Sequence, residues 1–164
     1  MSQIEELNEF LRWPDPLGDD YQLTEVDAPE DWAQAFTATC KGEQIGTVLV
    51  QFITRTPLDA SYPAGVRDRL VKVVDAEDEA VGPEALQLTA EKLFAQDPEL
   101  RRIVLATPVD DVPQIARGEA AGFRYVVDVD VKGGPGQVDE LSLLAAEPAW
   151  VIEESKHLDD VPTH

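Results

Sequence analysis

A dense group of carboxylates lies in the middle of the sequence, between a stretch typical of a strand and a stretch typical of a helix. Residues 70–74, LVKVV, predict the strand, and the helix is predicted to begin at Pro83. A turn of this kind often binds phosphate, because a helix N-terminus offers unpaired N–H groups and a positive dipole end. Here Pro83 has no N–H to donate. The carboxylates are Asp75, Glu77, Asp78, Glu79 and Glu84. Three interpretations are open: a working anion site, a remodelled anion site, or only a capped helix. The negative charge of these side chains is the opposite of what a phosphate site needs, and it favours a remodelled site.

Other residue types that carry chemistry are scarce or poorly placed. The acidic group lacks the ladder of ligands and the central glycine of a calcium-binding loop, so we expect no metal there. Cys40 has no second cysteine with which to form a disulfide or a zinc site, and we interpret it as a small core residue. The two histidines, His157 and His164, lie in the C-terminal tail, where solvated side chains are the rule. No catalytic residue is identified from residue types alone.

The charge of the chain restricts its partners. Thirty-three acidic residues stand against 13 basic ones, which gives a formal net charge of -20. Such a surface repels nucleic acid and anionic membranes and attracts cationic amines, although solubility is its simplest explanation. No apolar run is long enough to span a membrane, and the N-terminus has no signal-peptide core. We therefore expect a cytoplasmic protein that binds neither nucleic acid nor membrane.

Three segments are expected along the chain. Residues 1–19 predict an amphipathic helix and a linker, residues 20–146 a single domain, and residues 147–164 an acidic tail. The domain begins with a strand at 21–26 and a hairpin at 35–53 whose turn lies between Gly42 and Gly46. A polar excursion at 54–69 follows. Its arginines, which are Arg55, Arg67 and Arg69, belong either to a flap that binds an anion or to ordinary surface pairs, and we favour the pairs.

The second half of the domain predicts a strand, a helix and a strand in parallel connection. The strands are expected at 70–74 and 103–106, joined by the helix that begins at Pro83. A second helix follows Asp110 and Asp111 and ends before Gly122. A final hairpin comprises an alternating strand at 123–131 and a return strand at 138–145. The expected fold is α+β, with a mixed, mostly antiparallel sheet, a central parallel β-α-β crossover and flanking helices.

This order of elements resembles the Gcn5-related N-acetyltransferase family over residues 36–144. The most specific piece is ARGEAAGFRYVVDVDV, residues 116–131, which resembles the family's helix, Gly-Phe pair and strand near the C-terminus. Residues 97–126 also resemble the siderophore acyltransferase branch. The resemblance implies acetyl-CoA as cosubstrate, and it places the coenzyme pyrophosphate at the turn before Pro83.

The same resemblance assigns a coenzyme site. Val81 and Gly82 match the end of the family's phosphate-binding motif, while Ala80 takes its first glycine position and Glu77 its basic or amide position. The loop is thus degenerate, and counted from its strand it is about two residues short. The splayed ends of the two parallel strands would expose main-chain groups to the pantetheine arm. The residues assigned to the coenzyme are therefore Val73, Val74, Asp75, Val81 and Gly82.

Two further departures concern the catalytic side and the acceptor side. Gly118 occupies the position of the family's acidic tyrosine, and Asp111 that of its helix-opening asparagine, so neither role transfers. Only residues 27–32 separate the first two strands, where the family usually has one or two helices. The pocket must be completed by the N-terminal helix, by the arginine-bearing excursion or by a second subunit, so a homodimer is one expectation.

Two functions fit these observations. The first is an acyl-CoA-dependent N-acetyltransferase acting on a small cationic amine, with a degenerate coenzyme loop. The alternative is a non-catalytic binding or regulatory module on the same fold that has lost coenzyme A. The acidic loop and Pro83 favour loss, whereas Val81, Gly82 and the strand before them favour retention.

Overall fold

The structure of the protein is a computed structural model, and it describes residues 17–74, 83–132, 136 and 138–148. The expected N-terminal helix and C-terminal tail lie outside these residues. The elements in chain order are β1 Tyr21–Val26, β2 Gln34–Cys40, β3 Glu43–Phe52, η1 Ile53–Arg55, η2 Pro57–Ala60, β4 Arg69–Val74, α2 Pro83–Gln96, β5 Ile103–Pro108, α3 Val112–Ala120, β6 Arg124–Lys132 and β7 Val138–Ala146.

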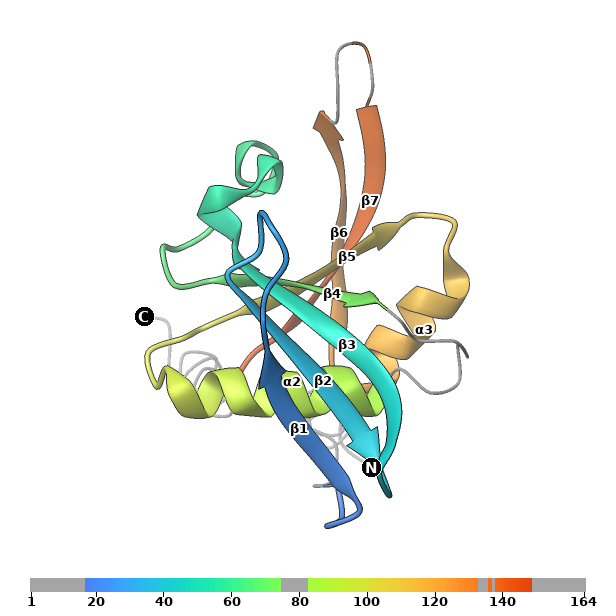
Figure 1. Ribbon diagram of the computed structural model, residues 1–164. Coiled ribbons are helices and arrows are strands. Elements are labelled where there is room, and N and C mark those ends of the chain that lie inside the picture. The colour runs from blue at the N-terminus through green and yellow to red at the C-terminus, as the bar shows by residue number, and fades with distance from the viewer. Residues whose placement is uncertain (1–16, 75–82, 133–135, 137, 149–164) are drawn as a thin grey trace, which may run out of the picture.

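The strands form one seven-stranded sheet in the order β1-β2-β3-β4-β5-β7-β6 (Figure 1). Only β4 and β5 run parallel, with Val71 opposite Leu105, and α2 connects them. Every other neighbouring pair is antiparallel. The expected α+β fold with a central parallel crossover is therefore confirmed.

The hairpin of β2 and β3 turns at Lys41 and Gly42, earlier than the turn expected between Gly42 and Gly46. Lys41 and Gly42 both have positive φ, 52° and 83°, which is the geometry of a two-residue hairpin turn that twists with its strands. A bulge between Ala38 and Thr39 shifts the register of β2 against β3. Cys40 follows this bulge at the end of the strand and is half-buried rather than a core residue, so its expected burial is wrong.

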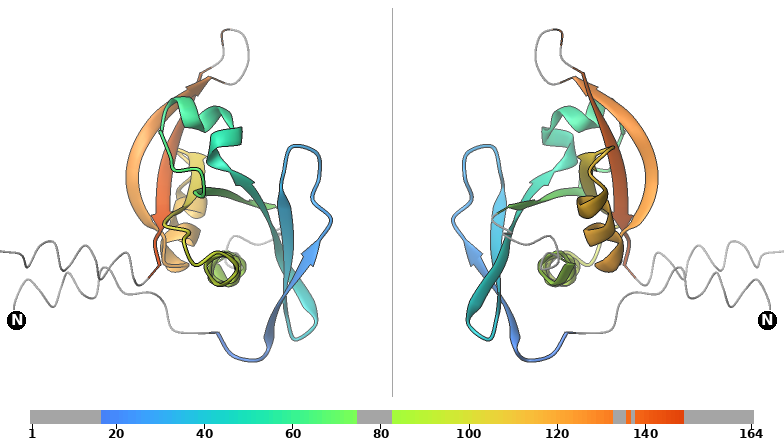
Figure 2. Two further views of the ribbon diagram at one scale, coloured as in Figure 1. Left: turned by 90° about the vertical axis from the view of Figure 1, so that its left-hand side faces the viewer. Right: turned by 90° about the vertical axis from the view of Figure 1, so that its right-hand side faces the viewer.

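The two faces of the sheet are covered differently. Helices α2 and α3 lie on one face, and Figure 2 shows α2 end-on between the β1–β3 half and the β5–β7 half. The core beneath them includes Phe36, Val71, Leu86, Leu105 and Leu144. We call the opposite sheet face the outer face. Its smaller core consists of Ile53, Leu58, Val104, Val131 and Leu143.

The excursion between β3 and β4 is a packed element. Ile53 in η1 is 0% exposed and Leu58 in η2 is 3% exposed, so apolar side chains hold both short helices against the outer face. Ser61 Oγ donates a hydrogen bond to the Asp130 carbonyl, 2.5 Å away, and Arg102 donates one to Tyr62 Oη at 2.6 Å. Such anchoring does not fit a mobile flap.

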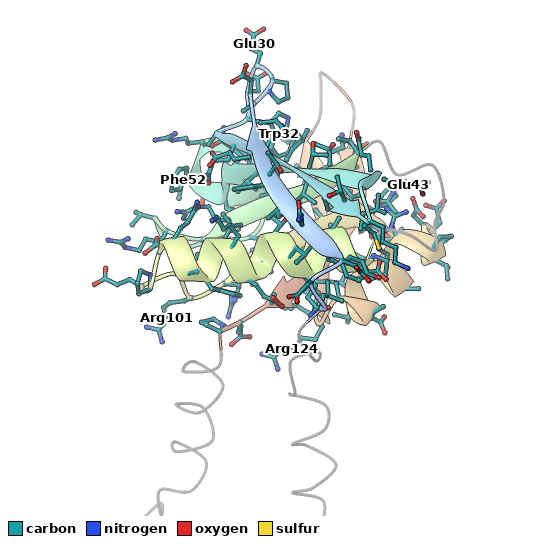
Figure 3. All side chains as sticks on the ribbon, turned by 60° about the horizontal axis from the view of Figure 1, so that its bottom comes forward. Glu30, Trp32, Glu43, Phe52, Arg101 and Arg124 are labelled. Atoms are coloured by element: carbon teal, nitrogen blue, oxygen red, sulfur yellow. The ribbon has the colours of Figure 1, made fainter. Side chains whose placement is uncertain are left out.

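The arginines of this excursion contact neighbouring side chains of the protein: Arg67 pairs at the surface, whereas Arg69 is nearly buried. Arg67 lies 2.9 Å from an oxygen of Asp97, and Arg69 lies 3.5 Å from the other oxygen. Phe52 is the last residue of β3 and lies at the other end of that strand from Glu43 (Figure 3). The guanidinium groups of Arg69 and Arg55 lie 4.0 Å and 4.7 Å from the centroid of its ring. These contacts join the end of β3, the start of β4 and the turn after α2.

The last strands depart from the expected pattern at one point. β6 forms as predicted and pairs only with β7, at the edge of the sheet. A bulge between Tyr125 and Val127 breaks the expected clean alternation of buried and exposed side chains. Tyr125 is 52% exposed, Val126 42% and Val127 37%. In the described part of the chain, no helix is long and apolar enough to cross a membrane.

Candidate functional site

The parallel strands β4 and β5 pair along only part of their length. Their register ends at Val71 and Leu105. Beyond that point β4 pairs with β3 alone and β5 pairs with β7 alone. We call this place the strand parting, made of residues 72–74 on β4 and 106–108 on β5, and Figure 1 shows the two strand ends diverging. Beyond the last pair, the main-chain groups of β4 and β5 that face each other do not hydrogen-bond to each other.

Two of the five predicted coenzyme residues lie at the strand parting. Val73 is paired with Val48 and Val74 with Thr47. Successive strand residues direct their N–H and C=O groups to opposite edges, so one of these two residues faces β3 and the other faces β5. Val73 packs against the helix-side core. Asp75, Val81 and Gly82 lie outside the described residues.

The first turn of α2 brings together three titratable groups. Tyr21 stands opposite Cys40 in the β1–β2 register. A hydrogen bond with Cys40, followed by the charges of Cys40 and of Glu84, raises the pKa of Tyr21. Oε2 of Glu84 is buried and has no hydrogen-bond partner among the described residues. An unpaired buried carboxylate oxygen beside the helix start makes this region unfavourable for an anion.

Helix α3 begins with an acidic cap and then packs tightly on the sheet. Asp111 accepts hydrogen bonds from Gln114 N at 3.2 Å and from Gln114 Nε2 at 2.6 Å. A Cβ on Gly118 would lie 2.7 Å from Leu105 Cδ2 and 3.2 Å from Leu144 Cδ2. Arg117, which precedes Gly118, is 8% exposed, and its Nε is buried without a partner. The position expected for a tyrosine thus has no room for a side chain.

A line of polar side chains that sequence reasoning missed crosses the sheet beside α3. Thr107 of the strand parting is 0% exposed and pairs with Ser142, whose Oγ lies 2.7 Å from Asp128 Oδ1. Burial, and then the hydrogen bond and charge of Asp128, raise the pKa of Tyr125. The sequence does contain polar residues at alternate positions of residues 124–132 and 138–146, which indicates a polar face on each strand. Only the register of the two strands shows that these polar side chains lie beside one another.

No metal site is found in the part of the chain that the structure describes. No group of three or more His, Cys, Asp or Glu side chains there is arranged to hold an ion. The acidic residues from Asp75 to Glu79 lie outside that part, so only their spacing in the sequence bears on whether they bind a metal.

Comparison with known proteins gives structural likeness only. No family model and no curated protein sequence matches the chain. An uncharacterised protein from Bacillus halodurans matches with a TM-score of 0.59 and 16% identity, over 76% of this chain and 63% of that one. The aminoglycoside acetyltransferase AAC(6')-Ib in complex with coenzyme A matches with a TM-score of 0.58 and 19% identity, over 75% of this chain and 70% of that one. The ribosomal-protein-S5-alanine acetyltransferase from Vibrio fischeri matches with a TM-score of 0.51 and 19% identity, over 73% of this chain and 63% of that one.

The chain has the Gcn5-related N-acetyltransferase fold. The likeness spans less than two thirds of the Bacillus protein and of the Vibrio protein. Within this fold, the short loop between β1 and β2 departs from the family's usual pattern of helices, as the sequence predicted.

The cap of α3 in this N-acetyltransferase fold gives a first testable result. We expect Asp111→Ala to lower the free energy of unfolding by about 1 kcal/mol, because the N–H of Gln114 loses its acceptor. Asp111→Asn keeps an acceptor oxygen and should stay within about 0.5 kcal/mol of the parent protein. Urea denaturation of the three proteins measures the difference, and equal losses in both variants would contradict a capping role.

Proposed function

We propose that the protein is an acyl-CoA-dependent N-acetyltransferase that acts on a small amine and has a degenerate coenzyme loop. The strand parting carries this proposal, because it is a gap in main-chain pairing in the middle of an otherwise continuous sheet. Unpaired main-chain groups in a folded interior need a partner, and an extended ligand rich in amides supplies one.

The residues at the strand parting fit the pantetheine arm of acetyl-CoA. Either Val73 or Val74 directs its N–H and carbonyl groups away from β3, in strand geometry, and amide groups of the arm can hydrogen-bond there as an added strand. The thioester, when bound, supplies an activated acyl group. A main-chain N–H at this edge would polarise its carbonyl, and the strand parting would hold the amine in position to attack.

The charge of the protein supports an amine as acceptor. A net charge of -20 produces a field that attracts ammonium groups over long distances. AAC(6')-Ib, which shares the fold, was also solved with acetyl-CoA and paromomycin and with coenzyme A and kanamycin. A cationic small molecule is therefore the acceptor class that charge and fold both favour.

The start of α2 supports the degenerate loop. Pro83 removes one main-chain donor at the helix start, and Glu84 places an unpaired carboxylate oxygen beside it. Carboxylates repel the phosphates of a coenzyme by about 1 kcal/mol for each close pair even at the dielectric constant of bulk water. We therefore infer that the pantetheine arm, rather than the pyrophosphate, supplies most of the affinity.

The alternative is a non-catalytic module on this fold that has lost coenzyme A. Two observations favour it: the charge at the start of α2, and Gly118, which has no room for the tyrosine that would protonate a leaving thiolate. The two functions differ in whether an acyl thioester binds at all.

Calorimetry with two thioesters separates these functions. Acetyl-CoA and S-acetylpantetheine share the reactive arm, and only the first carries nucleotide phosphates. At low salt we expect S-acetylpantetheine to bind at least as tightly as acetyl-CoA, because the acidic loop repels the phosphates. Salt at about 1 M shortens the screening length to about 3 Å and should strengthen acetyl-CoA binding while leaving the matched thioester nearly unchanged.

Two outcomes would contradict parts of this proposal. Much tighter binding of acetyl-CoA that weakens with salt would show a working phosphate site and refute the degenerate loop. Binding of neither thioester at either salt concentration would refute the acetyltransferase and support the non-catalytic module.

A further inference from the structure

The described part of the outer face at the strand parting carries one cation, Lys72. Register and packing place Leu70 on the outer face and Val71 on the helix face, so Lys72 projects from the outer face. It is exposed, and it is the first residue of β4 beyond the last pair with β5. A single ammonium group therefore stands on the outer face at the strand parting.

No carboxylate occupies the neighbouring outer-face positions of the sheet. The same alternation places Thr47 and Leu49 of β3 beside Lys72, with Thr37 of β2 one strand further. Across the strand parting, β5 presents Ala106 and Pro108, and β7 presents Leu141 and Leu143. Among the described residues of the sheet, neutral outer-face positions therefore surround this one cation.

The ammonium of Lys72 has no partner among the residues that the structure describes. Arginines elsewhere in the domain have partners: Arg69 pairs with Asp97, Arg102 with Tyr62 and Arg124 with Glu147. Lys72 makes no ion pair or hydrogen bond of this kind. The hydroxyls of Thr37 and Thr47, 3.1 Å apart, bond to each other and add a polar but uncharged surface beside it.

We propose that the acceptor carries a carboxylate next to its amine, as a free amino acid does, and that Lys72 binds this carboxylate. This inference rests on the proposed acetyltransferase function and replaces the simple cationic amine with a zwitterion, whose ammonium group carries the reacting nitrogen. A zwitterion has no net charge, so the field of the protein does not repel it as it would repel a simple anion. Ala106 and Leu141 favour an apolar side chain on this acceptor.

Matched pairs of ligands test the proposal without requiring turnover. Leucine and 3-methylbutylamine differ only in the carboxylate, as do phenylalanine and phenethylamine. We expect the amino acid of each pair to bind about tenfold more tightly, which is the effect of one hydrogen bond to a charged group. Ligand-observed NMR on the full-length protein measures both dissociation constants.

Three variants assign the preference to Lys72. Lys72→Ala should abolish the difference within each pair, and Lys72→Arg should retain most of it. Lys92→Ala removes an exposed cation from α2, with the same change in net charge, and should leave the preference unaltered. If turnover occurs, Lys72→Ala should raise KM for the amino acid about tenfold and leave KM for acetyl-CoA unchanged.

Each contrary result overturns the proposal. Equal or tighter binding of the decarboxylated amines, no binding of either class, or an unchanged preference in Lys72→Ala would each do so. A rise in KM for acetyl-CoA alone would mean that Lys72 binds the coenzyme instead. Binding of a thioester is measured separately, so failure of the acceptor class is distinguishable from failure of the acetyltransferase function.

Discussion

Replacing Asp97 by alanine is expected to lower the free energy of unfolding by about 3 kcal/mol, the lower end of the range for breaking a buried ion pair. Asp97 contacts Arg67 at 2.9 Å and Arg69 at 3.5 Å, and the side chains of Asp97 and Arg69 are 14% and 11% exposed. Nε of Arg69 is already buried without a partner. Loss of the carboxylate would leave a nearly buried guanidinium without its ion-pair partner. Guanidinium chloride denaturation measures the change.

A neighbouring pair supplies the matched control. Glu99 lies 2.9 Å from Arg67, but its side chain is 75% exposed. Glu99→Ala should therefore change stability by at most about 0.5 kcal/mol. Similar losses in the two variants would contradict the importance of burial at Asp97.

The same carboxylate predicts a dependence of stability on pH. Burial alone would raise the pKa of Asp97, but hydrogen bonds from Arg67 and the Glu99 N–H, with the charges of Arg67 and Arg69, outweigh it and lower the pKa. A lowered pKa adds stability above the unfolded value of about 4, and this stability is lost as the pH falls through the folded pKa. Asp97→Asn should flatten the acid limb of the stability curve. An unchanged limb would contradict the assignment.

Introducing a tyrosine at Gly118 is expected to destabilise the protein by about 3 kcal/mol or more, and it should not create a catalytic acid. The first side-chain carbon would already lie 2.7 Å from Leu105 Cδ2 and 3.2 Å from Leu144 Cδ2, both in buried core residues. Overpacking of this kind costs about 1–3 kcal/mol for small insertions, and a phenol ring is much larger. Thermal and urea denaturation measure the loss.

The exposed side of the same helix offers the control. Ala116 is exposed on α3, so Ala116→Tyr adds the same ring without meeting the core and should stay within about 1 kcal/mol of the parent. A stable Gly118→Tyr variant would contradict the packing of α3. Thiol release from acetyl-CoA faster than in the parent would contradict the conclusion that this position cannot hold the acid.

Much of the fold follows from local sequence signals. LVKVV and IVLA are nearly continuous apolar runs, which is typical of strands buried on both faces, and they form β4 and β5. Asp111 and Gly122 bound α3 as their types indicate, since one caps the helix and the other has φ of 98° after its end. The fold class needed no more than these patterns and their order.

The candidate site follows less directly. The residue types predicted that Val73 and Val74 end a strand before a helix, but the break in pairing after Val71 and Leu105 is a matter of register between segments more than 30 residues apart. The polar line from Thr107 to Asp128 has the same origin. Bulges at Ala38 and Tyr125 changed which side chains face the core, and no local pattern predicted them.

By itself the sequence determined the elements, their parallel crossover, the acidic charge and the loss of the expected tyrosine, because each depends on residue type and on neighbours within a few positions. Tertiary structure alone decided that Lys72 projects from the outer face, that Arg67 and Arg69 meet Asp97, and that Gly118 lies against Leu105 and Leu144. These depend on contacts between residues distant in the chain, which are fixed only when the strands adopt their register and the helices pack on the sheet.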